Sequence, residues 1–201
     1  MPDVRVTISL PFALLLADGD YPTADANSEI VRVTAGPPEE SGSRTLISAS
    51  FKHPDTDDTD EIQSLKSQDT DRLLRRTNKV LRWYRSVRRK ADITERTRAQ
   101  ASPFLFEALA GINNPAWTSP IEYEEAGPAP VVRSVAEITA TVKAGLATGE
   151  DPDVDSLFLL DAERALQQGR FREAILFCWS TIDPTFRVME KRFWANYPAA
   201  S

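Results

Sequence analysis

The chain has 201 residues, of which 41% are hydrophobic, so it is long enough for one ordinary domain or two small ones with a real core. Its formal net charge is -6, and its one cysteine, Cys178, excludes a framework of intramolecular disulfides. The sequence has no CxxC motif, no histidine cluster and no apolar run long enough to cross a bilayer, which argues against structural zinc and a membrane span. We therefore expect a globular, cytoplasmic protein.

The first residues have the pattern of a half-buried strand. Four apolar residues alternate there with polar ones, which is typical of a strand with one buried face: Val4, Val6, Ile8 and Leu10. The segment lacks the cleavage site of a signal peptide. Two further strands are predicted over residues 29–34 and 44–51, and residues 17–20 are predicted to form a turn. Together these segments indicate a small antiparallel sheet.

A long helix is predicted over residues 61–90, which contain no proline or glycine. Residues 53–61 before it form an acidic loop that we expect to cap this helix. In the second half of the helix, apolar residues fall on one side and Lys and Arg residues on the other. The helix is therefore expected to pack along one side and to expose cations on the other.

A link between two parts of the chain is indicated by five prolines within residues 102–132. Two short pieces in this stretch, 104–109 and 121–123, have the composition of strands. After the link, Ser134 and Glu137 form an S-x-x-E capping box, which predicts that a helix begins here and continues to Gly149.

Two more helices are predicted after Gly149. Asp151 is predicted to cap the first of them, with Pro152 at its first helical position and Gly169 at its end. The second is predicted to begin at Phe171 and to be kinked or stopped by Pro184. These two helices form a predicted hairpin, with one helix before it.

The predicted fold class is α+β. A small antiparallel sheet with a long basic amphipathic helix is expected in residues 1–110, a proline-rich linker in 111–132, and an all-helical hairpin or bundle in 133–201.

The charge distribution suggests one candidate site. Residues 72–98 hold eleven Lys and Arg residues against two carboxylates, a local net charge of +9. Such a face can follow the phosphates of RNA or DNA, and the predicted contacts are Arg72, Arg75, Arg76, Lys79, Arg82 and Arg89. The alternative is that the chain's own acidic segments neutralise this face, since the protein as a whole is acidic.

No pattern of residues in the sequence predicts a catalytic, metal or cofactor site. His53 is the only histidine and precedes several carboxylates, but a calcium loop would need glycine at Asp60 and glutamate at Lys66. A Ser-His-Asp triad has no nucleophile elbow, and Cys178 lies on the apolar face of a predicted helix, where we expect a core residue. Phosphate-binding glycine motifs are also missing from the sequence.

Residues 161–183 resemble two known kinds of helical protein. Gly169, Phe171 and Ala174 look like the middle of a tetratricopeptide repeat, but the sequence has one copy, and a lone repeat does not form a stacked array.

The small residues of this helix pair, Ala162, Ala165 and Ala174, are also similar to the helical core of HEPN-like proteins of prokaryotic toxin, antiphage and RNA-processing systems. Residues 74–97 look like the N-terminal half of uncharacterised bacterial proteins that carry such a C-terminus, so this resemblance extends over about residues 70–190.

The ribonuclease activity of HEPN domains does not transfer to this chain. That activity uses an Arg followed a few residues later by a His on one helix face. Arg187 is followed by Arg192 and Phe193 instead, and no histidine follows His53. The resemblance therefore implies a non-catalytic relative that binds, or a chain that ends before the catalytic helix.

Aromatic residues near the end of the sequence suggest a second candidate site. They provide more apolar surface than a short hairpin can bury, and they are Trp179, Phe186, Phe193, Trp194 and Tyr197. We expect a non-enzymatic bacterial protein that uses its C-terminal helices for self-association or protein binding, within a stress or antiphage module. The alternative for these aromatics is a core between the two parts of the chain.

Overall fold

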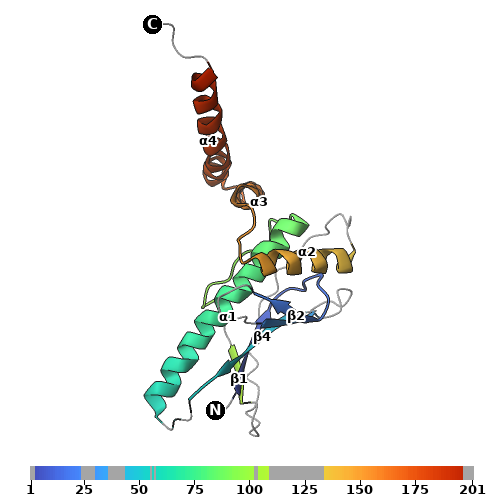
Figure 1. The fold of residues 1–201 in the computed structure, drawn as a ribbon, viewed down its shortest axis with the longest axis vertical. Helices are drawn as coiled ribbons and strands as arrows, with labels where there is room; N and C mark the ends of the chain where they lie inside the picture. The colour runs from blue at the N-terminus through green and yellow to red at the C-terminus, as the bar shows by residue number, and fades with distance from the viewer. Residues whose placement is uncertain are drawn as a thin grey trace.

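We describe the fold from a computed structural model of the chain. The structure describes residues 3–23, 30–35, 44–54, 56, 58–101, 104–108 and 134–196. Within these ranges the side chains of residues 3, 35, 108 and 192–196 are left out of the description. A β-sheet and two helices form the body, and a pair of helices projects from it (Figure 1).

The sheet has five antiparallel strands in the order β2-β3-β4-β1-β5. These strands are β1 (Asp3–Leu10), β2 (Gly19–Pro22), β3 (Ile30–Ala35), β4 (Thr45–Lys52) and β5 (Phe104–Ala108). The α+β class predicted from the sequence is therefore confirmed.

Strand β1 follows the predicted alternation and lies inside the sheet. Its residues Val6, Ile8 and Leu10 have no exposed surface, because they point toward the helices. Val6 lies opposite Ala49 of β4 on one side and Phe106 of β5 on the other. Strand β1 thus lies between β4 and β5, and β5 follows β1 by about one hundred residues in the chain.

The prediction of a turn over residues 17–20 was wrong in part, because β2 begins at Gly19. Tyr21 is fully buried, and its hydroxyl donates a hydrogen bond to the carbonyl of Ala17 at 2.7 Å. Pairing with β3 and burial of this tyrosine stabilise a four-residue strand that its own sequence indicates only weakly.

Helix α1 (Thr59–Arg88) covers one face of the sheet. Asp58 is its N-cap and accepts a hydrogen bond from the backbone N–H of Asp60 at 2.9 Å, so the prediction that the acidic loop caps this helix is confirmed. Its buried apolar residues pack on the sheet and are Leu73, Val80, Leu81 and Tyr84.

The extended segment after β1 joins the sheet to both helices of the body. The N–H of Leu14 donates to Thr45 Oγ1 at 2.7 Å, and the N–H of Leu15 donates to the Tyr84 hydroxyl at 3.2 Å. The N–H of Ala17 donates to Thr139 Oγ1 of the next helix at 2.8 Å. Side-chain oxygens thus satisfy backbone groups that have no strand partner.

Helix α2 (Val135–Thr148) has the predicted capping box, in which the Ser134 and Glu137 side chains each accept from the other residue's backbone N–H. It ends at Gly149, which adopts a left-handed conformation with φ 75°. Helix α2 packs against α1 and β2, so this first helix of the predicted C-terminal part belongs to the body.

Helices α3 (Val154–Gln167) and α4 (Phe171–Asn196) form the predicted hairpin (Figure 1). The predicted cap at Asp151 was wrong. Asp153 caps α3 instead, and hydrogen bonds from the Ser156 side chain and backbone lower the pKa of its carboxyl group. Asp151 instead accepts a hydrogen bond from Arg82 of α1. The residues next to Asp151 in the sequence do not indicate this contact, because Arg82 lies far from it in the chain.

The predicted stop at Pro184 was also wrong, since α4 remains helical through it to Asn196, whereas the kink stays a prediction. Pro184 removes the helical hydrogen bond to the carbonyl of Ser180. Both residues are exposed, so water can satisfy that carbonyl. None of the helices in the described ranges has a stretch long and apolar enough to cross a membrane.

Candidate docking surface on the C-terminal hairpin

The two helices of the hairpin pack on each other through small residues and one aromatic pair. Ala162 and Ala165 of α3 and Ala174 of α4 are buried between them. The rings of Phe158 and Phe177 stack with their centroids 6.4 Å apart. Gly169 makes the turn with φ 70°, a conformation that residues with a Cβ rarely adopt.

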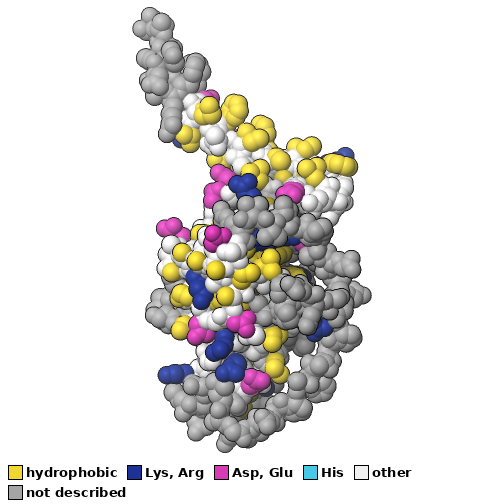
Figure 2. All heavy atoms as spheres, turned by 90° about the vertical axis from the view of Figure 1, so that its right-hand side faces the viewer, with side chains coloured by type: hydrophobic (Ala, Val, Ile, Leu, Met, Phe, Trp, Pro, Cys, Tyr) yellow, Lys and Arg dark blue, Asp and Glu magenta, His cyan; other side chains and the backbone are white. Residues whose placement is uncertain are grey.

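Most of the large apolar side chains of α4 are exposed to solvent. Eight of them are exposed to between 46% and 69%, and together we call them the α4 surface: Phe171, Ile175, Leu176, Trp179, Ile182, Phe186, Val188 and Met189. Figure 2 shows hydrophobic side chains gathered over the hairpin. Contiguous apolar surface of this kind is unusual on a monomer and is typical of an interaction site.

The predicted interface residues lie partly in this surface. Trp179 is 63% exposed and Phe186 is 69% exposed, so neither fills a core between the two parts of the chain. The side chains of Phe193 and Trp194 lie outside the described residues, as does the whole of Tyr197. Cys178 is half-buried, not fully enclosed as the core prediction required.

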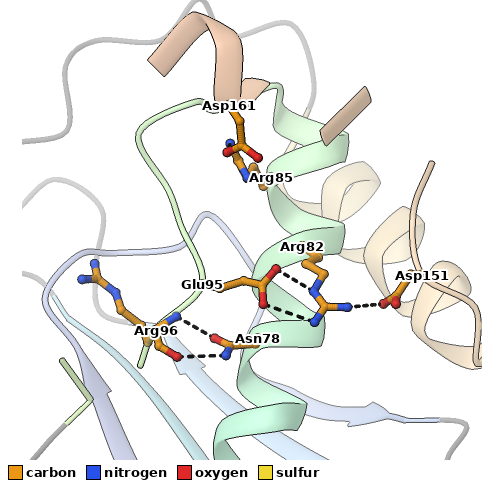
Figure 3. Close-up of polar contacts among 7 residues, drawn as sticks. All are labelled: Asn78, Arg82, Arg85, Glu95, Arg96, Asp151 and Asp161. Carbon is orange, nitrogen blue, oxygen red and sulfur yellow. Dashed lines mark hydrogen bonds and ion pairs between the residues drawn. The ribbon is translucent and has the colours of Figure 1, made fainter. Parts of the chain in front are cut away.

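An ion pair connects the hairpin to the body. Arg85 of α1 pairs with Asp161 of α3, and their side chains are 8% and 30% exposed (Figure 3). The Nε atom of Arg85 has no hydrogen-bond partner within the described part of the chain. Asp161 is therefore the main compensation for placing this guanidinium in a poorly hydrated position.

A second arginine of α1 connects two loops beside this pair. Arg82 donates from Nε to Glu95 at 2.8 Å and from Nη1 to Asp151 at 2.7 Å (Figure 3). Burial lowers the pKa of Arg82, but the two carboxylates outweigh it and hold the pKa above its usual value. The Nε1 of Trp83 also donates to the carbonyl of Glu150 at 3.1 Å. Helix α1 thus holds the loop between α2 and α3.

The six cations predicted to bind nucleic acid do not form one exposed face. Arg76 is 3% exposed and lies over the ring of Phe51 at 5.0 Å. Arg76 therefore does not belong to the predicted exposed cationic face. Its planar guanidinium stacks on an aromatic ring that the folded sheet brings beneath the helix. Arg82 is engaged by Glu95 and Asp151, as described above.

The other four predicted cations lie nearer to solvent. Arg75 and Arg89 are exposed, and the side chain of Arg72 is 49% exposed with Nη1 3.8 Å from a carboxylate oxygen of Asp69. Lys79 is half-buried. The exposed cations of this region, Arg72, Arg75 and Arg89, therefore form an interrupted row.

His53 is involved in a local contact with α1. Its Nε2 pairs with the carboxylate of Asp69, which is 2% exposed. Asp55 and Asp57 lie outside the described residues. In the described ranges, no group of three or more His, Cys, Asp or Glu side chains is arranged to hold a metal ion.

The sequence contained a signal for the extent of the α4 surface. Apolar residues recur at spacings of three and four through and beyond Pro184, which indicates a continuous helical face. Their exposure could not be predicted, because it depends on which side of α4 packs against α3.

Comparison of the chain with protein-family models, with curated proteins and with solved structures finds no match.

Proposed function

We propose that this protein acts by binding another protein chain through its C-terminal hairpin and that it is not an enzyme. The exposure of the α4 surface is the single observation that carries this proposal. Contact between water and the eight large apolar side chains of this helix is unfavourable, so a second surface that covers them would stabilise the protein. The hairpin also projects from the body, which leaves this surface accessible (Figure 1).

The HEPN-like resemblance and a role in a prokaryotic stress or antiphage module remain predictions. The small residues buried between α3 and α4 are compatible with a HEPN-like core, but close helix packing requires small residues in many folds. The docking proposal rests on exposed surface and does not depend on that family.

Hydroxyl-radical footprinting of the dilute chain tests the docking proposal. We expect rapid oxidation of Trp179, Phe186 and Met189, since each is more than 60% exposed. Phe51 is the matched control for Phe186, because it is the same residue type at 5% exposure and should react slowly. Phe186 and Phe51 reacting at the same slow rate would mean that the α4 surface is packed against the body, and the proposal would fail.

RNA or DNA binding through α1 is the second candidate, and the exposure of Arg75 and Arg89 favours it. Fluorescence anisotropy with single-stranded oligonucleotides across a salt series is the measurement. This function requires steeply salt-dependent binding. The logarithm of the binding constant should fall linearly with the logarithm of the salt concentration, and the magnitude of this slope should decrease by about 0.7 for each lost phosphate contact. R75E/R89E should therefore lower the slope by about 1.4. R32E/K52E is the control, because it makes the same charge change at exposed positions of the sheet.

Two results would remove this second candidate. One is the absence of binding at low salt. The other is an equal loss of binding in R75E/R89E and R32E/K52E, which would reflect the net charge of the protein and not a site on α1.

A further inference from the structure

Part of the α4 surface forms a regular row. Its residues follow one another at spacings of four, three, four and three, and we call this row the α4 seam: Ile175, Trp179, Ile182, Phe186 and Met189. The same spacing defines the a and d positions of a coiled coil, in which each side chain inserts between four residues of a facing helix. The occupant that fits the α4 seam is therefore another helix with a matching row.

Among the helices that the structure describes, only α4 offers such a row. The side of α4 around Ala174 and Phe177 is occupied by α3. In the other described helices the exposed large apolar residues do not form a row at these spacings, and they are Val135, Val154, Leu159 and Leu166. A row that can pair with itself is the requirement for a two-fold symmetric dimer.

The size of the surface fits a dimer. At about 200 Å² of surface for each side chain, the five side chains of the α4 seam expose on the order of 600 Å². Specific dimers bury about 800 Å² on each partner. The α4 seam therefore supplies most of the area that one copy contributes to such an interface.

The charges beside the α4 seam favour antiparallel helices. Arg172 and Glu190 are both exposed, and neither forms an ion pair within the described part of the chain. They are 18 residues apart, which is about five turns of an α-helix, so they project from the same edge of α4.

Ile182 is at the middle of the α4 seam, about 15 Å along the helix from Arg172 and about 12 Å from Glu190. Antiparallel pairing about this residue brings Arg172 of one copy beside Glu190 of the other, at both ends of the seam. In a parallel pair the two-fold axis would run along the helices, so these residues of the two copies would lie on opposite edges of the seam and no Arg172–Glu190 pair would form.

We propose that two copies of this chain dimerise through the α4 seam, with their α4 helices antiparallel about a two-fold axis at Ile182 and with Arg172 of each copy paired with Glu190 of the other. This inference rests on the proposed docking function and names its occupant. The apolar row supplies the affinity, and the two ion pairs determine the orientation.

Sedimentation equilibrium of the full chain over a range of concentrations tests the dimer. We expect a reversible monomer–dimer equilibrium for the unmodified chain. Ile182→Glu should weaken it at least about thirty-fold, because it places two carboxylates against each other at the centre of the interface. Val188→Glu is the matched control, since it puts the same charge on an exposed apolar position of α4 outside the seam, and dimerisation should persist.

Circular dichroism of the same samples should show unchanged helix content in both variants, because both positions are exposed in the single chain. A dimer that Ile182→Glu leaves intact would overturn the proposal.

Charge reversal tests the orientation of the helices. Arg172→Glu and Glu190→Arg should each weaken dimerisation by about tenfold, since each exchanges two attractive pairs for two repulsive ones. The double variant R172E/E190R should restore it, because the pairs form again with their signs exchanged. If the double variant is weaker than both single variants, antiparallel pairing is wrong.

Footprinting of the same samples separates this inference from the docking function. A chain that remains a monomer at every concentration while Trp179 and Phe186 are rapidly oxidised overturns the dimer and leaves the surface for a different protein. A monomer in which both residues are protected overturns the dimer and the docking function together.

Discussion

Asp161→Ala is expected to lower the free energy of unfolding by about 2–3 kcal/mol. The substitution leaves the guanidinium of Arg85, which is 8% exposed, without its carboxylate. Removing one partner of a fully buried pair costs about 3–5 kcal/mol, and the smaller value is expected here because Asp161 is 30% exposed and water can enter. Urea denaturation measures the change, and hydrogen exchange should show that α3 loses the most protection.

Asp151→Ala is the matched control, because it also removes an aspartate from an arginine of α1. It should cost at most about 1 kcal/mol, since Asp151 is 50% exposed and Arg82 keeps its contact with Glu95. The double variant R85M/D161L should recover most of the loss by replacing the ion pair with apolar contact. Equal costs for the two Asp→Ala variants would show that the Arg85 pair is not the stronger connection between hairpin and body.

Gly145→Ala is expected to destabilise the protein by about 1–3 kcal/mol, although alanine is the better helix former. A Cβ atom at this position would lie 2.4–2.6 Å from three carbon atoms of the Trp83 ring, which is closer than such atoms approach in folded proteins. In an open helix the same substitution gains about 1 kcal/mol, so the steric overlap between α1 and α2 decides the sign. Thermal and urea denaturation measure the change.

Two further variants isolate the overlap. Ala144→Gly, at the exposed neighbouring position, measures helix propensity alone and should cost about 1 kcal/mol. Adding Trp83→Leu to Gly145→Ala removes the ring that a Cβ would meet, so the cost of Gly145→Ala should shrink or reverse in that background. An increase in stability from Gly145→Ala alone would show that α2 can shift away from Trp83 at little cost.

Local sequence predicted the features that depend on neighbouring residues. The alternation in residues 4–10 predicted a strand with one buried face, and the box formed by Ser134 and Glu137 predicted the start of α2. Asp58 was expected within an acidic loop that caps α1, and it does so. These predictions were right because side-chain periodicity and capping hydrogen bonds act over a few residues along the chain.

The candidate site could be predicted only in part. The sequence identified Trp179 and Phe186 as an apolar excess near the end of the chain, and both are exposed. It also placed Arg76 and Arg82 on an open cationic face, whereas Phe51 covers the first, and Glu95 and Asp151 engage the second. The helical pattern around an arginine does not indicate its partner when that partner lies in another part of the chain.

The sequence by itself therefore determined the elements of this protein: an N-terminal set of strands, a long capped helix and three further helices. Tertiary structure decided how they combine. It placed β1 between β4 and β5, made a strand of residues 19–22 and turned the α4 surface outward. The physical reason is that strand pairing, burial and ion pairing join residues that are distant in the chain, so their free energies depend on the whole fold.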